Sequence, residues 1–153
     1  MKIMDFAVVN FAEELGHAEL DRQHLALVEA ICGLRDAPRD RDRDLRAWER
    51  LVVAVRDHFL WEESEMRREK FPDLAAHKRD HARQLMSLNE HVARFRNSSL
   101  FDPGAVLAME AWNGRHIRGR DREFAEFLRD PETWWARREL AAWEGDRFLL
   151  RAG

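Results

Sequence analysis

Apolar residues recur every three or four positions over long stretches of the chain, which is the spacing of one face of an α-helix. The stripe in the second stretch runs through Leu45, Trp48, Val52, Val55, Phe59 and Met66, and that in the third through Leu74, Leu85, Leu88, Val92 and Phe95. No stretch keeps the alternation of a half-buried strand. The pattern therefore predicts an all-α protein whose helices pack with their apolar stripes inward.

Prolines and polar caps indicate where these helices begin and end. Proline interrupts the pattern at positions 38 and 72. Asp102-Pro103 and Asp130-Pro131 each pair an N-cap carboxylate with a proline in the first helical turn. We expect four main helices in an antiparallel bundle, followed by a short extra C-terminal helix. The expected ranges are about 18–36, 41–69, 73–96, 103–129 and 131–144.

Polar groups interrupt the inward stripes in every main helix. The stretch HFLWEESEM at 58–66 places a histidine and a glutamate one helical turn apart among apolar neighbours. The inward positions hold five histidines and two carboxylates, namely His24, His58, Glu62, His77, His81, His116 and Asp121. A buried carboxylate without a partner costs several kcal/mol, so this set of side chains needs compensation.

A metal centre compensates such groups better than hydrogen bonds alone. Imidazole suits iron, zinc or copper, and carboxylates can bridge two cations. The seven side chains exceed the four ligands of a tetrahedral zinc site, and they suit two six-coordinate metals that share both carboxylates. The donor types leave the identity of the metal open, since zinc and manganese also accept them.

Composition narrows the remaining classes of function. The 153 residues carry a net charge of −3, which argues against a broad electrostatic contact with nucleic acid. The single cysteine excludes an intrachain disulfide and a cysteine-based zinc site. No apolar run reaches the length of a membrane span, and the N-terminus lacks the layout of a signal peptide. We therefore expect a cytoplasmic protein that binds neither membrane nor nucleic acid.

Four segments, in order along the chain, carry a resemblance to a known family. They read DRQH at 21–24, HFLWEESEM at 58–66, HKRDH at 77–81 and WNGRHIRGRD at 112–121. Through these motifs, over roughly residues 15–129, the chain resembles the hemerythrins, and specifically the single-domain bacteriohemerythrins. The resemblance implies an up-down-up-down four-helix bundle with two non-heme iron ions as its cofactor.

The resemblance also implies a role for each ligand. The expected ligands are His77, His81 and His116 for one iron, His24 and His58 for the other, and Glu62 and Asp121 as bridges. An oxo or hydroxo group would form the third bridge. The iron with two histidines has an open position, and O2 would bind there reversibly.

Reversible O2 binding for carriage, storage or delivery is the function that the resemblance favours. A histidine-rich site stabilises high-valent iron less well than a carboxylate-rich site, so we expect no enzyme. Two alternatives stay open. One is a sensor of O2 or redox state that acts through a partner, and the other is a diiron enzyme for peroxidase chemistry, nitric oxide reduction or repair of iron centres.

The expected O2 pocket departs from the family at one residue. Leu27, Phe59 and Trp112 match apolar walls, but Asn113 stands where a leucine is common. An amide brings a donor, an acceptor and room for water. Asn113 either turns outward and matters little, or it makes the pocket wetter and shortens the life of the O2-bound form.

The spacing of two ligands predicts a local change of helix type. His116 and Asp121 are five residues apart, which separates them by about 140° on a regular α-helix. Both side chains reach one metal pair if the helix widens into a π-type turn near 117–121. Gly119 would ease such a turn.

The bundle would occupy residues 1–130, and residues 131–153 would form an aromatic-rich extension. The extension contains Trp134, Trp135 and Trp143, half of the six tryptophans of the chain. So much aromatic surface favours a covered position. Three alternatives stay open: the extension packs on the bundle, forms a homodimer, or docks a client protein.

Overall fold

The computed structural model describes residues 14–149, with side chains up to residue 143. The elements are α2 (Ala18–Asp36), α3 (Arg41–Arg68), α4 (Leu74–Ser98), α5 (Pro103–His116), the π-helix η1 (Ile117–Asp121), α6 (Arg122–Arg129) and α7 (Pro131–Leu149). No strand and no helix that is long and apolar enough to cross a membrane occurs in this part of the chain. The outer ends of the expected ranges 1–130 and 131–153 lie outside the described residues.

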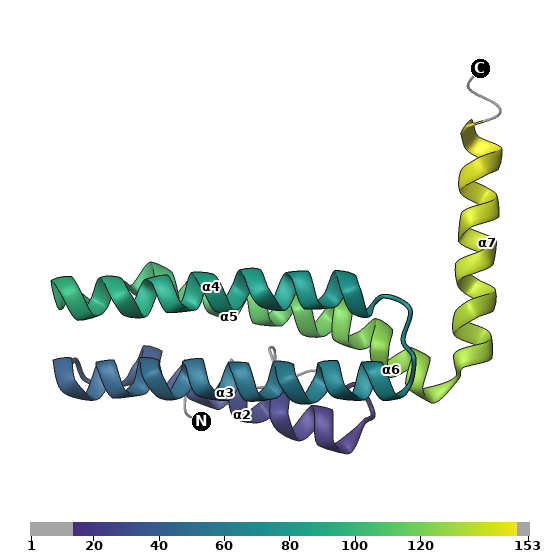
Figure 1. The fold of residues 1–153 in the computed structure, drawn as a ribbon. Coiled ribbons are helices and arrows are strands. Elements are labelled where there is room, and N and C mark those ends of the chain that lie inside the picture. Colours follow the sequence, from purple (N-terminus) through teal and green to yellow (C-terminus); the bar gives the residue numbers. More distant parts are fainter. Residues whose placement is uncertain (1–13, 150–153) are drawn as a thin grey trace.

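Four helical segments form an antiparallel bundle, in which α5, η1 and α6 follow one another as the fourth segment (Figure 1). Helix α3 packs against both α2 and α4, and α2 packs against α5. Short connections join consecutive helices, so each helix runs opposite to the one before it. The all-α prediction and the up-down-up-down order are therefore confirmed.

The two Asp-Pro pairs begin helices as predicted. The carboxylate of Asp102 accepts a hydrogen bond from the backbone N–H of Gly104 at 2.9 Å, and α5 begins at Pro103. Asp130 accepts one from the backbone N–H of Thr133 at 3.0 Å at the start of α7. These bonds satisfy N–H groups that have no partner inside the helix.

The apolar core is divided by a layer of polar side chains. The larger cluster joins α2, α3, α4 and α5 and includes Leu27, Val55, Phe59, Leu88 and Met109. A second cluster, at the end of the bundle where α6 lies, consists of Met66, Phe71, Phe124, Phe127 and Trp134. On α3 the completely buried Glu62 lies between Phe59 of the first cluster and Met66 of the second. The bundle therefore buries a charged group midway along its core.

Helix α7 is longer than the expected short helix at 131–144, since it ends at Leu149. Its first turns pack on the bundle, where the Trp134 ring meets Phe71 and Phe127 with ring centroids 5.6 and 5.4 Å apart. Beyond these turns the helix runs away from the bundle (Figure 1). The part of α7 beyond its first turns therefore does not cover the bundle.

Candidate metal centre

All seven predicted ligands lie in the interior. Their exposed fractions are 1% for His24, 5% for His58, 0% for Glu62, 1% for His77, 2% for His81, 6% for His116 and 0% for Asp121. Each of the four segments of the bundle contributes at least one of them. Their atoms form two groups that could each hold a metal ion, and Asp121 belongs to both groups.

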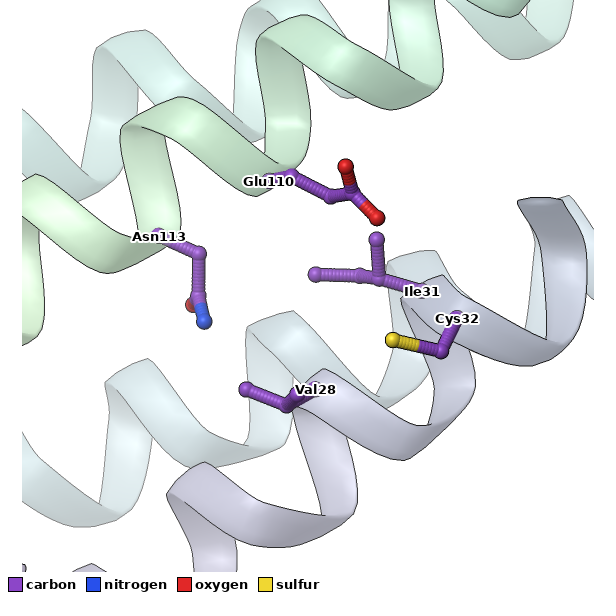
Figure 2. A pocket seen from close by; sticks show the side chains of 5 residues that line it. All are labelled: Val28, Ile31, Cys32, Glu110 and Asn113. Atoms are coloured by element: carbon purple, nitrogen blue, oxygen red, sulfur yellow. The ribbon is translucent and has the colours of Figure 1, made fainter. Parts of the chain in front are cut away.

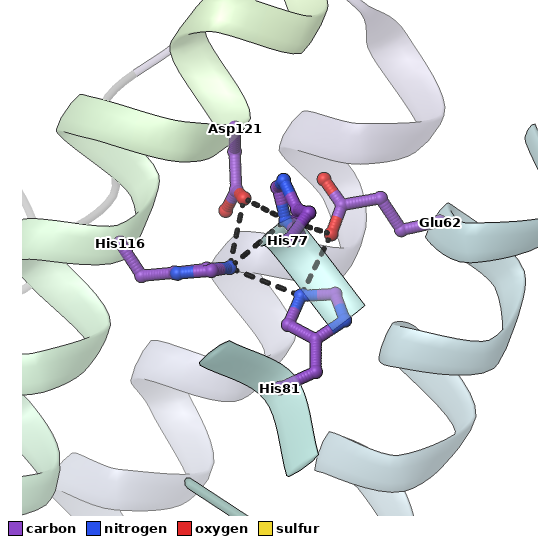
Figure 3. Close-up of side chains that lie close together, drawn as sticks. All are labelled: Glu62, His77, His81, His116 and Asp121. Carbon is purple, nitrogen blue, oxygen red and sulfur yellow. Dashed lines mark hydrogen bonds and ion pairs between the residues drawn. The ribbon is translucent and has the colours of Figure 1, made fainter. Parts of the chain in front are cut away.

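Three imidazole rings form the centre of the first group (Figure 3). The Nε2 atom of His116 lies 3.0 Å from Nε2 of His81 and 3.1 Å from Nε2 of His77. Two ligands at right angles around a first-row metal, each about 2.1 Å from it, are about 3.0 Å apart. The three nitrogens are therefore spaced as ligands on one face of a six-coordinate ion.

The two carboxylates reach the same three rings. Oε2 of Glu62 lies 3.2 Å from Nε2 of His77 and 3.3 Å from Nε2 of His81. Oδ1 of Asp121 lies 3.1 Å from Nε2 of both His77 and His116. The first group thus offers three nitrogen and two oxygen ligands.

The second group is smaller and lies on the other side of the carboxylates. Nε2 of His24 lies 3.0 Å from Oδ2 of Asp121, the oxygen that does not face the first group. Nε2 of His58 lies 3.9 Å from Oε2 of Glu62. Asp121 therefore stands between the two sets of histidines, as a bridging ligand does, whereas Glu62 faces the first set and lies farther from the second.

The unpartnered atoms of the centre fit a pair of cations. Among residues 14–143, no hydrogen bond of acceptable geometry reaches either carboxylate oxygen of Glu62 or of Asp121, or either ring nitrogen of His24. The close distances between these groups arise because their lone pairs converge on shared points. Two cations would satisfy the four carboxylate oxygens and the Nε2 atom of His24 that faces Asp121. Imidazole with carboxylate suits iron.

The electrostatics of the first group keep its carboxylates charged. Burial and the nearby Asp121 carboxylate raise the pKa of Glu62, but contacts with two histidines outweigh both and lower it to about 2. Burial also raises the pKa of Asp121, yet the neighbouring His116 holds it well below its usual value. Burial lowers the pKa of His77, but its contacts with both carboxylates raise it to about 9. The carboxylates are therefore in the form that binds cations.

Outer partners orient two of the histidines. Nδ1 of His58 lies 2.9 Å from Oε1 of Gln23, and Nδ1 of His81 lies 3.1 Å from Oε1 of Glu63. Since Gln23 offers an oxygen, Nδ1 of His58 carries the proton and Nε2 faces the centre. Burial lowers the pKa of His58 to about 4, so its ring is neutral and able to bind metal.

Sequence reasoning missed both outer partners. Glu63 follows the ligand Glu62 directly, yet its side chain is only 14% exposed, and it also pairs with Lys78 at 3.0 Å. Helical periodicity cannot find such residues, because they sit beside the inward stripe rather than on it. The available signal was chemical, since a histidine that binds metal commonly donates its second N–H to an oxygen.

The predicted π-type turn is present. Residues Ile117–Asp121 form the π-helix η1, directly after His116. A π-turn takes one residue more than an α-turn, so it brings a side chain five positions later back to the same face. This explains how Asp121 comes within 3.1 Å of His116.

The predicted pocket residues fall into two pairs. Phe59 stacks on His81, with ring centroids 3.7 Å apart and planes at 4°, and Trp112 stacks on His116 at 4.4 Å and 17°. These two aromatic rings contact each other at 5.8 Å. They cover two histidines of the first group and shield them from water.

Leu27 and Asn113 line different hollows. Leu27 is buried beside a surface hollow of about 250 Å³ that His58 also lines. Asn113 is only 4% exposed and lines a small cavity between α2 and α5. The alternative in which Asn113 turns outward is therefore wrong.

Comparisons with known proteins agree with this centre. A family model described as "Hemerythrin HHE cation binding domain" matches residues 15–128. The bacteriohemerythrin of Stenotrophomonas maltophilia (strain R551-3) is 26% identical over 134 residues, which cover 86% of this chain and 88% of that protein. The myohemerythrin of Theromyzon tessulatum is 30% identical over 108 residues, or 71% of this chain and 82% of that protein. No solved structure matches the chain significantly. The chain belongs to the hemerythrin family.

Proposed function

We propose that the protein binds O2 reversibly at a pair of non-heme irons, for carriage, storage or delivery. His77, His81 and His116 would hold one iron, His24 and His58 the other, and Glu62 and Asp121 both. When bound, the iron pair supplies the electrons for O2 binding. The residues of the chain hold the irons, exclude water and tune their surroundings.

The observation that carries this proposal is the unequal number of nitrogen ligands in the two groups. The first group offers three histidines and two carboxylates, whereas the second offers two histidines and Asp121, with Glu62 farther away. An ion in the second group would therefore have a place for a ligand from solution. A buried, histidine-rich centre with one open place suits a binding protein better than a strong oxidant.

The aromatic cover supports binding rather than turnover. Phe59 and Trp112 lie flat on the rings of two histidines, and Phe59 is 4% exposed. Apolar rings at these places keep water and reductants from the first group. A bound ligand would then leave by dissociation more often than by reaction.

The test is a spectrum taken with and without O2. The purified protein should contain two irons per chain, and after reduction without air it should gain a new ligand-to-iron absorption band when O2 is added. The band should disappear when argon removes the O2. A chain that takes up zinc but no iron, or that passes directly to the oxidised spectrum, would contradict the proposal.

One observation favours the alternatives of a sensor or an enzyme. The side-chain nitrogen of Asn113, three residues before His116, is buried and finds no hydrogen-bond partner among the residues that the structure describes. A polar group one helical turn from a metal ligand favours loss of the O2-bound form. Decay of its absorption band over hours supports carriage, whereas decay within seconds with release of peroxide supports sensing or turnover.

A further inference from the structure

A small cavity between α2 and α5 lies outside the metal centre. It is lined by Val28, Ile31 and Cys32 from α2 and by Glu110 and Asn113 from α5 (Figure 2). It leaves about 10 Å³ for the centre of a water molecule, which is room for one water. Its walls carry polar groups from one helix and mainly apolar groups from the other.

The cavity lies one helical turn from the metal ligands. Val28 follows His24 by four residues, about 6 Å along α2, and Asn113 precedes His116 by three residues, about 4.5 Å along α5. Because α2 and α5 run in opposite directions, both displacements point to the same end of the bundle (Figure 1). The cavity is therefore adjacent to both groups of ligands.

One polar side chain of the cavity lacks a partner, and a carboxylate lies one helical turn from it. Nδ2 of Asn113 has no hydrogen-bond partner among the described residues, and the residue is only 4% exposed. Glu110, one turn earlier on α5, is 8% exposed and accepts a hydrogen bond from Arg35 at 2.5 Å. A buried amide without a partner is costly, and ordered water is the usual remedy.

We propose that the cavity holds one ordered water, which accepts a hydrogen bond from Asn113 Nδ2 and donates one to the Glu110 carboxylate. Side chains three residues apart on a helix are neighbours, so one water can span them. Arg35, which pairs with Glu110, connects these groups to the surface, because its side chain is 26% exposed and also pairs with Asp36. Asn113, the water and Glu110 thus form a polar path from the surface to the metal centre.

The path could transfer protons. The effect of this transfer on O2 binding rests on the proposed function. A proton from solvent forms an O–H bond on Glu110. That bond breaks when the proton passes to the water, and the water passes one of its own protons to the bound O2, which is the acceptor that the proposed function supplies. Glu110 returns to the carboxylate, and no oxidant or reductant is needed. Proton delivery by this path would promote loss of the O2-bound form.

The water itself is tested without any iron chemistry. A high-resolution crystal structure of the full chain should show density within hydrogen-bonding distance of Asn113 Nδ2 and of Glu110. Nuclear Overhauser transfer from water to the Asn113 side-chain amide should show the same contact in solution. Both signals should vanish in Asn113→Leu. An empty cavity in the parent protein, with no transfer from water, overturns the proposal.

The role of Glu110 is tested with Glu110→Gln, which keeps the shape of the side chain but cannot relay protons as a carboxylate does. The O2-bound form of this variant should decay about tenfold more slowly. Glu29→Gln, on the exposed side of α2, removes the same charge and should decay like the parent. Equal decay in Glu110→Gln and the parent overturns the path, even if the water is present.

The two proposals fail in different ways. If no spectrum depends on O2, the proposed function and the role of the path both fall, while diffraction still decides whether the water exists. If O2 binds but the cavity is dry, only the water site and its path fall.

Discussion

At the scale of residues, Asn113 is the side chain that most distinguishes this centre. It is buried, its side-chain nitrogen has no hydrogen-bond partner in the part of the chain that the structure describes, and it lies one turn before His116. We predict that Asn113→Leu lengthens the life of the O2-bound form severalfold, because an apolar wall excludes water and its protons. Stopped-flow absorption after mixing the reduced protein with O2 measures this lifetime. An unchanged or shortened lifetime, in a variant that melts like the parent, would count against the idea.

Glu63 supports a second prediction at this scale. Its carboxylate lies 3.1 Å from Nδ1 of His81 and fixes the direction of that ring. We expect Glu63→Ala to weaken metal affinity about 10–100-fold, as loss of such outer partners does. Competition with a chelator measures the affinity. Glu65→Ala is the matched control, because Glu65 lies on the same helix and pairs with Arg68 instead. Equal loss in both variants would refute a specific role for Glu63.

The ligands were predictable because each lies on an inward stripe where charge or imidazole is unexpected. The side chains that orient these ligands, Gln23 and Glu63, could not be predicted in the same way. The same limit applies to Asn113, whose direction depends on the space left between α2 and α5. Periodicity locates the face of a helix, but it does not report which gaps the packed faces leave.

At the scale of elements, the helix bounds followed closely from the sequence. The predicted ranges 18–36 and 41–69 match α2 and α3 to within one residue, because caps and prolines limit them. The predicted range 103–129 divides into α5, η1 and α6, and the five-residue spacing of His116 and Asp121 anticipated the division. The direction of α7 was not predictable, since it depends on contacts of Trp134 with rings distant in sequence.

The start of α7 gives a prediction that depends on pH. Arg138 donates two hydrogen bonds to Asp73, and these lower the pKa of the Asp73 carboxyl below 3.8. The pKa of Asp73 is lower in the folded state than in the unfolded state. The pair therefore stabilises the fold fully above pH 3.8, and this effect is lost as the pH falls through the lowered pKa. Arg138→Ala should cost about 0–1 kcal/mol at neutral pH, because the pair is partly exposed.

Urea unfolding at neutral and acid pH tests this pair. In acid the cost of Arg138→Ala should shrink to the part that comes from its contact with the Trp134 ring, 4.9 Å away. Arg137→Ala is the control, because Arg137 pairs with Glu126 and not with Asp73. A cost that does not change with pH would contradict the assignment of this pair.

At the scale of the whole molecule, the ligands divide the apolar core and connect all four segments of the bundle. Metal removal should therefore destabilise the fold, because it leaves Glu62 and Asp121 buried without cations. For metal at about 1,000 times its dissociation constant, linkage gives about 4 kcal/mol. At about 2–4 °C per kcal/mol, the melting temperature should fall by about 8–16 °C.

Calorimetry before and after chelation measures this loss, and a matching recovery on adding iron back serves as the control. An unchanged melting temperature would mean that the buried polar layer is satisfied without metal.

The central claim is that seven buried side chains hold two irons that bind and release O2 unchanged. The most direct measurement is the amount of O2 that the reduced protein takes up and returns, per chain, over repeated cycles of oxygenation and removal under argon. We predict one O2 per pair of irons, returned as O2 in each cycle, with recovery of the reduced spectrum. Uptake that is not returned, or O2 that comes back as peroxide, would contradict the account.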